Sequence, residues 1–213
     1  MKTPLLILGA GAFAEDVFDI AMDTENFDVI GFACDAGRDA LPETLLGKPV
    51  YWLEDVISTL PEGTQVVPGM GSAKRSTGLK FCSDAGLRLA NVIHPTARVS
   101  SRAHLGHGIV VGPQSTISVG CRLADGVIIN RGVTIGHHTQ LHACATVAPG
   151  ANVAGNVVIM DGATIGMGGN VIEKITVGPG AMVGSGSVVV KNVDAGVTVV
   201  GIPAKPLIKA DNT

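Results

Sequence analysis

The chain has 213 residues, enough for one large domain or two small ones. Its formal net charge of −3 gives no electrostatic basis for binding nucleic acid or an anionic membrane, and no apolar run approaches the length of a bilayer span. The four cysteines occur singly and no basic leader opens the chain, so we expect reduced thiols and a cytoplasmic protein.

The first ninety residues alternate strand-like runs, glycine turns and helix-like stretches. Residues 4–8, 27–33 and 65–67 are strand candidates, and helices are predicted after the glycine turns at 9–14 and 68–72. This alternation is typical of a parallel sheet of the nucleotide-binding type, and its length corresponds to half of a Rossmann fold.

A glycine fingerprint opens this region. Residues 9–14, GAGAFA, have the form G-x-G-x-x-A, and Asp35 follows 24 residues after Gly11. Glycines at a strand end let backbone N–H groups approach phosphate, and the carboxylate could bind a ribose hydroxyl. Because a full dinucleotide site needs a doubled unit, we favour a mononucleotide or a nucleotide sugar over a redox cofactor. A purely structural module stays open.

A strict hexad repeat fills the second half. From Ile93 to Val189 every sixth residue is Ile, Leu or Val, seventeen times in succession. Neither an amphipathic helix nor an alternating strand has this period, which indicates a parallel β-helix with three hexads in each triangular coil. All seven aromatic residues precede this segment, so we place the domain boundary near residue 90.

The histidine cluster is the candidate catalytic element. His137, His138 and His142 fall within six residues, and a period of eighteen places His137 beside Gly155 on the next coil, about 4.8 Å away. A general base with a backbone N–H one coil away is the minimum equipment for acyl transfer. Asn130, at the preceding corner, could orient a substrate group.

Five stretches resemble one family. They are 9–17 (GAGAFAEDV), 91–100 (NVIHPTARVS), 129–137 (INRGVTIGH), 148–157 (APGANVAGNV) and 201–205 (GIPAK). The family is that of the bacterial nucleotide-sugar acetyltransferases, of the sialic-acid O-acetyltransferase and bacillosamine-pathway N-acetyltransferase type, in the left-handed β-helix superfamily.

The resemblance implies a fold and a reaction. Residues 1–90 would be a Rossmann-like nucleotide-sugar-binding domain, 91–190 a left-handed parallel β-helix, and 191–213 a tail that contributes to the CoA site. The protein would be a homotrimer with acetyl-CoA between neighbouring prisms and no metal. It would acetylate the amine of a UDP-, dTDP- or GDP-linked amino sugar for surface-glycan biosynthesis.

The resemblance also implies the site. The base falls on His137, with His138 beside it, and the oxyanion donor falls on the N–H of Gly155. Sugar-nucleotide contacts fall on Gly11, Phe13, Asp35, Gly71, Asn130 and Thr146, and CoA contacts on Gly155, Met167, Ser185, Pro203 and Lys205.

Three positions depart from the family's pattern. His138 stands where the family has Glu or Asp, Thr146 replaces a second histidine, and Phe13 replaces a histidine that many members have. A neutral imidazole orients a histidine base less well than a carboxylate does. We therefore expect an amine acceptor, which loses its proton near neutrality, rather than a hydroxyl.

Three alternatives stay open. The first is a sugar O-acetyltransferase. The second is a zinc enzyme similar to the γ-class carbonic anhydrases, with His137 and His142 as ligands, although the third ligand would fall at Ser101 and His104 is out of register. The third is a degenerate protein that binds a nucleotide sugar or acts as a scaffold, because the acid after His137 is lost.

Overall fold

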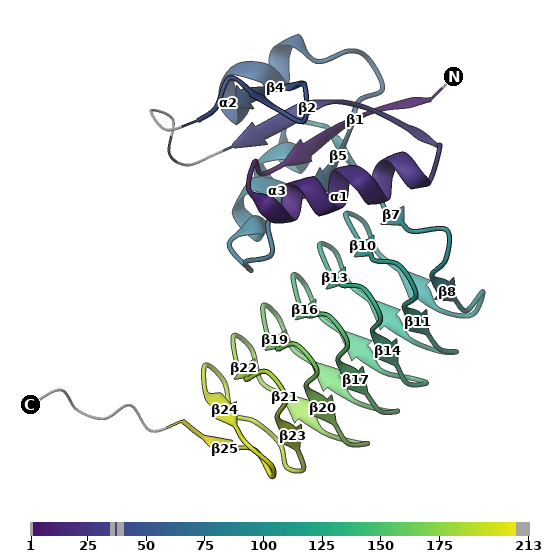
Figure 1. Cartoon of the computed structure of the whole chain (residues 1–213), viewed down its shortest axis with the longest axis vertical. Helices are drawn as coiled ribbons and strands as arrows, with labels where there is room; N and C mark the ends of the chain where they lie inside the picture. Colours follow the sequence, from purple (N-terminus) through teal and green to yellow (C-terminus); the bar gives the residue numbers. More distant parts are fainter. Residues whose placement is uncertain (1, 35–36, 38–40, 208–213) are drawn as a thin grey trace, which may run out of the picture.

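A computed structural model describes residues 2–34, 37 and 41–207 of the chain. An N-terminal α/β unit lies over the first coils of a long three-sided prism, and β24 and β25 lie at the opposite end (Figure 1). No helix of the described residues is long and apolar enough to span a membrane.

The α/β unit is built on a sheet with the strand order β3-β4-β2-β1-β5-β6. Its elements are β1 Thr3–Leu8, α1 Ala12–Asp23, β2 Phe27–Cys34, β3 Thr44–Leu45, β4 Lys48–Trp52, α2 Leu53–Val56, the 3₁₀ turn Ile57–Thr59, β5 Gln65–Pro68, α3 Arg75–Asp84 and β6 Arg88–Leu89. The predicted strands and helices are confirmed as β1, α1, β2, β5 and α3. The antiparallel β3–β4 pair, α2 and β6 were not predicted from the sequence.

Residues 5–8 of β1 are all apolar and buried because both faces of the sheet are covered there. Leu5 and Ile7 pack in one cluster with the buried face of α1, whereas Leu6 and Leu8 pack in a second cluster with residues of α2 and α3. A strand buried on both sides has no polar face to alternate with, as is usual in parallel sheets.

The prism consists of two-residue strands joined by four-residue turns. They are β7 Val92–Ile93, β8 Arg98–Val99, β9 His104–Leu105, β10 Val110–Val111, β11 Thr116–Ile117, β12 Arg122–Leu123, β13 Ile128–Ile129, β14 Thr134–Ile135, β15 Gln140–Leu141, β16 Thr146–Val147, β17 Asn152–Val153, β18 Val158–Ile159, β19 Thr164–Ile165, β20 Asn170–Val171, β21 Thr176–Val177, β22 Met182–Val183 and β23 Val188–Val189, followed by β24 Thr198–Val200 and β25 Lys205–Pro206. The strands β7 to β23 end on the seventeen residues of the hexad series, which confirms the predicted repeat.

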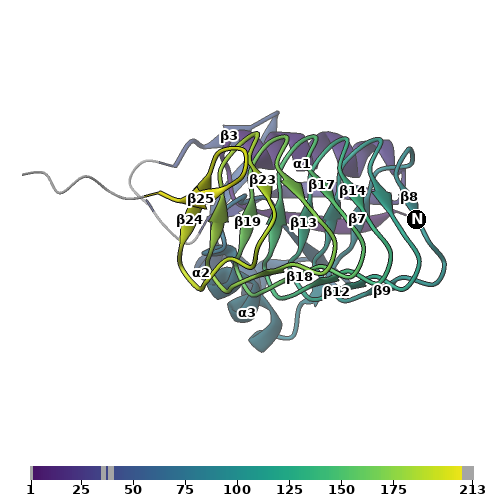
Figure 2. The same cartoon turned by 90° about the horizontal axis from the view of Figure 1, so that it is seen from below.

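Each strand from β7 to β20 pairs in parallel with the strand eighteen residues later, as Thr116 does with Thr134. This pairing gives three sheets that begin with β7, β8 and β9. We call the turns from the β7 sheet to the β8 sheet the first corner, those from the β8 to the β9 sheet the second corner, and those from the β9 back to the β7 sheet the third corner. Figure 2 shows the coils stacked along the prism.

Most turns place a glycine in the left-handed backbone conformation. A side chain occupies it instead at five turn positions of the prism, with φ between 54° and 61°: Gln114, His138, Cys144, Asn156 and Lys174. This conformation costs an L-residue roughly 1–2 kcal/mol relative to glycine, so a side chain retained there invites a functional explanation.

The α/β unit packs on the outer face of the β7 sheet. Val92, Val110 and Ile128 point out of the prism and join the cluster that contains Leu5 and residues of α1. The next residue of this outward column is Thr146, which is 8% exposed, so the column turns polar at its fourth coil.

Candidate active site

The second corner brings His137 against Gly155. A Cβ atom at Gly155 would lie 2.6 Å from Cε1 and 2.7 Å from Nε2 of His137, so only glycine leaves room for the ring in this position. The imidazole is exposed. The predicted contact between neighbouring coils is therefore present in the structure.

The N–H of Gly155 is oriented outward by the residue beneath the corner. The buried hydroxyl of Thr139 donates a 2.9 Å hydrogen bond to the carbonyl oxygen of Ala154. Because the peptide between Ala154 and Gly155 is planar and trans, an inward C=O directs the Gly155 N–H away from the prism. That N–H donates to no acceptor within the described part of the chain.

His138 contacts His137 through the ring nitrogens. The two Nδ1 atoms are 3.2 Å apart and the rings meet edge to face at 75°. Gly120, one coil earlier, makes room for the second ring, since a Cβ there would lie 2.6 Å from Cδ2 of His138. An Nδ1–Nδ1 hydrogen bond requires one ring to donate and the other to accept, so the two tautomers are coupled.

A cavity at the first corner gathers two predicted sugar contacts. Phe13 of α1 and Asn130 both line it, and its volume is about 190 Å³. Its remaining wall comes from α1 and from the first corners of the upper coils: Asp16, Asp19, Ile20, Asp23, His94, Val110, Gly112, Pro113, Ile129 and Arg131. This pocket lies between the α/β unit and the prism. An acceptor substrate bound to the α/β unit could there meet an acyl donor bound to the prism.

Three further predicted contacts lie elsewhere on this unit. Gly11 is the N-cap of α1 and has open space around it, as a backbone approached by phosphate requires. Gly71 follows β5, and its carbonyl accepts a 3.4 Å hydrogen bond from the hydroxyl of Thr146. Asp35 lies outside the described residues.

The predicted CoA residues line the lower prism. Met167 and Ser185 are exposed turn residues of the first corner, two and three coils beyond that of Asn130. Pro203 and Lys205 are exposed in the tail around β25. These residues follow the same corner as the Asn130 cavity, towards the end of the prism away from the α/β unit.

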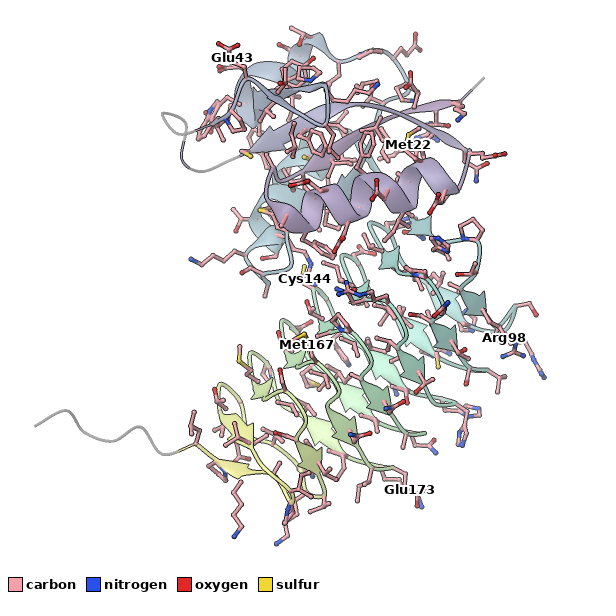
Figure 3. The ribbon with its side chains drawn as sticks, viewed as in Figure 1. Met22, Glu43, Arg98, Cys144, Met167 and Glu173 are labelled. Carbon is pink, nitrogen blue, oxygen red and sulfur yellow. The ribbon has the colours of Figure 1, made fainter. Side chains whose placement is uncertain are left out.

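The predicted site residues therefore form separate groups on one chain. The base and the oxyanion donor occupy the second corner, whereas Asn130, Met167 and Ser185 occupy the first corner. The second and third corners are likewise apart. In Figure 3, Glu173, one coil beyond Gly155 at the second corner, and Cys144, at the third corner, lie on opposite sides of the prism. The outer face of the β8 sheet separates the base from the first-corner residues.

One buried charge was missed by the sequence analysis. Arg75, at the start of α3, is 0% exposed and donates hydrogen bonds to oxygen atoms of both the α/β unit and the prism. Burial lowers the pKa of its guanidinium to about 10. Burial likewise raises the pKa of the thiol of Cys144, its neighbour at the third corner, so that thiol stays protonated at neutral pH.

The described residues contain no group of three or more His, Cys, Asp and Glu side chains placed to hold a metal ion. His137 and His142 lie at opposite ends of β15, one at the second corner and one at the third. Within one chain these two histidines therefore do not approach each other.

No protein-family model and no curated protein sequence matches the chain significantly. Solved structures match over nearly its whole length. The acetyltransferase domain of PglB from Neisseria gonorrhoeae FA1090, in complex with acetyl coenzyme A, has a TM-score of 0.89 at 30% identity, covering 97% of this chain and 100% of that chain. PerB from Caulobacter crescentus, in complex with CoA and GDP-perosamine, has a TM-score of 0.88 at 29% identity over 96% and 97%. WeeI from Acinetobacter baumannii AYE gives 0.87 at 27% over 97% and 100%.

The prism and its histidine corner define an acyltransferase with the left-handed parallel β-helix fold. This likeness extends through the α/β unit as well as the prism, as the coverage of both chains shows. The chain belongs to the nucleotide-sugar N-acetyltransferases of the hexapeptide-repeat family, which confirms the resemblance seen in the sequence.

Proposed function

We propose that this protein transfers the acetyl group of acetyl-CoA to the amine of a nucleotide-linked amino sugar in the cytoplasm. The observation that carries the proposal is the contact between the exposed His137 imidazole and Gly155, whose outward N–H has no acceptor in the described chain. The neighbours support the substrate class, since PerB holds CoA and GDP-perosamine and the PglB domain holds acetyl coenzyme A.

The proposed reaction uses these two groups in one step. Nε2 of His137 accepts a proton from the sugar amine as the nitrogen attacks the thioester carbonyl. The N–H of Gly155 donates to the oxyanion of the tetrahedral intermediate. Collapse of that intermediate breaks the carbon–sulfur bond and forms the amide. The departing CoA sulfur takes the proton from the His137 imidazolium, which restores the base, and no metal enters the step.

His138 selects the tautomer that the base needs. We assign the shared proton to Nδ1 of His137, with Nδ1 of His138 as the acceptor at 3.2 Å. This tautomer leaves Nε2 of His137 unprotonated. The assignment gives His138 the orienting part that a carboxylate plays elsewhere in the family.

We further propose that the complete site forms between two chains of a homotrimer. Asn130 and His137 belong to the same coil, so a threefold axis parallel to the prism brings His137 of one chain level with Asn130 of the next. The cavity reaches from the first coils down to that level, since Asn130 is in its wall, and Met167 and Ser185 lie below it. The acceptor sugar would approach from above and acetyl-CoA from below, with the base between them.

Thiol release from acetyl-CoA tests the proposal across a panel of UDP-, dTDP- and GDP-linked amino sugars, each paired with its hydroxy-sugar analogue. We expect release with one amino sugar, little release with its hydroxy analogue, and loss of most turnover in His137→Asn with the assembly intact. An unaffected His137→Asn variant contradicts the assignment of the base. About one zinc per subunit together with no release from any sugar would favour the metal alternative instead.

A further inference from the structure

Arg75 is the one charged side chain, among the residues that the structure describes, that is fully buried. Its Nε donates to the carbonyl oxygen of Gly126 at 2.8 Å, and one terminal nitrogen donates to that of Gly71 at 3.2 Å. The other terminal nitrogen donates to the carbonyls of Cys144 and Ala145 and to the hydroxyl of Thr146, at 2.7, 3.0 and 3.0 Å. One guanidinium thus joins the loop after β5 to the third corners of two successive coils.

All five acceptors are neutral oxygens, and the nearby carboxylate of Asp125 instead accepts the N–H of His107. A buried cation without an anionic partner gains little net stability, because the desolvation cost offsets most of its hydrogen bonding. An apolar side chain of similar volume would avoid that desolvation cost, although it would leave these oxygens without their present donor. Stability alone therefore does not account for an arginine here, and a role in fixing relative position does.

The two edges of the α/β unit are attached to the prism in different ways. Under α1, the apolar cluster draws Val92, Val110 and Ile128 from the prism. Under α3, the corresponding cluster draws only Cys144 from the described part of the prism. Cavities of about 430 and 330 Å³ flank this second edge, and both are bordered by Ser83, Leu89 and Asp125. Arg75 is accordingly the main tie along the α3 edge.

The same guanidinium holds two residues of the proposed substrate site by hydrogen bonds. Its partners include the carbonyl of Gly71 and the hydroxyl of Thr146, which are also joined to each other. Gly126 makes the approach possible, since a Cβ there would lie 2.8 Å from Cδ1 of Leu79 on α3 and its φ is +69°. Without the arginine, the α/β unit would pivot on its apolar edge under α1.

We propose that Arg75 is a positioning residue for acetyl transfer: it holds the nucleotide-binding unit in register with the acyl-donor side of the prism. The proposal rests on the proposed function. Loss of the guanidinium displaces the nucleotide, held by the α/β unit, from acetyl-CoA, held by the prism, while each of these two ligands keeps the contacts of its own folded part. A displacement of about 1 Å at a reacting atom is enough to reduce turnover by up to two orders of magnitude.

The test compares Arg75→Met with Lys74→Met. Lys74 is an exposed neighbouring cation at the N-cap of α3, and among the described residues its side chain makes no hydrogen bond to the prism. Binding of CoA and of UDP, GDP and dTDP is measured by calorimetry on each full-length protein, and turnover is measured at saturating substrates. In Arg75→Met we expect the dissociation constants of CoA and of the nucleotide that the parent binds to stay within about threefold of the parent values. We expect kcat to fall at least tenfold. Lys74→Met should leave all three values unchanged.

A second pair of variants guards against misfolding. Arg75→Lys keeps the charge and should recover part of kcat, and guanidinium ion at millimolar concentration should restore turnover to Arg75→Ala by filling the vacated site. Unchanged kcat in folded Arg75→Met, or a parallel loss of both ligands, overturns the proposal. If the parent protein binds both ligands but acetylates no amino sugar, the proposed function fails, and this outcome is visible before any variant is made.

Discussion

At the scale of single residues, the second corner is constrained by contact between neighbouring coils. The ring of His137 occupies the space that a side chain at Gly155 would need, and the backbone of Gly155 itself is not left-handed. Glycine is therefore required by the neighbouring imidazole and not by the local turn. This distinction can be measured, because the constraint should disappear when the ring is removed.

We predict that Gly155→Ala lowers the free energy of unfolding by roughly 1–3 kcal/mol and kcat by about a hundredfold, since the added methyl displaces His137. In a His137→Ala background the same substitution should be almost neutral for stability. Chemical denaturation of the four proteins in this double-mutant cycle measures the coupling. Additive effects would show that the glycine serves the backbone instead of the ring.

The hydrogen bond between the two imidazoles is the basis for proposing His138 as an orienting residue. We expect His138→Glu to match or exceed the parent rate, because a carboxylate accepts the Nδ1 proton of His137 more strongly than an imidazole does. His138→Ala removes the acceptor and should lower kcat about tenfold or more, with little change in the KM for acetyl-CoA. Steady-state kinetics on both variants measures these changes in kcat and KM. A large loss in His138→Glu would mean that the imidazole has a task of its own.

At the scale of elements, a two-residue strand serves two cores at once. In β13, Ile129 points into the prism, whereas Ile128 points outward into the cluster beneath α1. Both are 0% exposed, so burial alone does not distinguish them. Their different surroundings predict different consequences of substitution.

Ile129→Ala should destabilise the prism by about 2–5 kcal/mol through the cavity that it leaves. Ile128→Thr, which places at this coil the residue found at Thr146, should instead loosen α1 and leave the prism close to its parent stability. Amide hydrogen exchange separates the two, since exchange should accelerate in α1 for Ile128→Thr and throughout the coils for Ile129→Ala. Identical exchange patterns would rule out two separate cores.

The elements of the prism could be predicted because one constraint repeats in every coil. A narrow interior accepts one large aliphatic and one small residue in each hexad, and this pattern is written directly in the sequence. The β3–β4 pair was missed because β3 has two residues and its turn uses Leu46 and Gly47, both at positive φ, of which only the glycine is a recognisable signal.

The candidate site likewise contains one contact that the sequence predicts and one residue that it does not. The contact between His137 and Gly155 follows from the period of eighteen, so the sequence was sufficient for it. Arg75 could not be found in this way, since its acceptors in the prism are 51 to 71 residues away and four of its five partners are backbone carbonyls. Every residue type carries a backbone carbonyl, so the sequence does not indicate which carbonyls accept hydrogen bonds.

At the scale of the whole molecule, the proposed trimer places the first and second corners of each chain against two different neighbouring chains. If the complete site forms between chains, two inactive variants should complement each other. We predict that His137→Ala and Asn130→Ala are each impaired, and that co-refolded mixed trimers recover about a quarter of the parent activity, because one interface in four then combines two intact corners. Thiol release on purified mixtures measures this recovery.

The control is a mixture of His137→Ala with Gly155→Ala, which damages the same corner in every chain and should recover nothing. Light scattering on each mixture confirms that the species being compared are trimers. Complementation that is absent from the first mixture, in trimers of verified composition, would place the whole site within one chain.

The constant rise of the coils gives the prism a property that a globular enzyme lacks. Three coils separate the level of Asn130 from that of Ser185, and each coil rises about 4.8 Å, so the first corner spans roughly 14 Å between them. If acetyl-CoA lies along Met167 and Ser185 as proposed, this rise sets how far the donor extends from the base, and the number of coils matches the length of the co-substrate. A family member that used a donor of another length would need one coil more or fewer. That change would alter this distance by about 4.8 Å and leave the chemistry at the second corner unchanged.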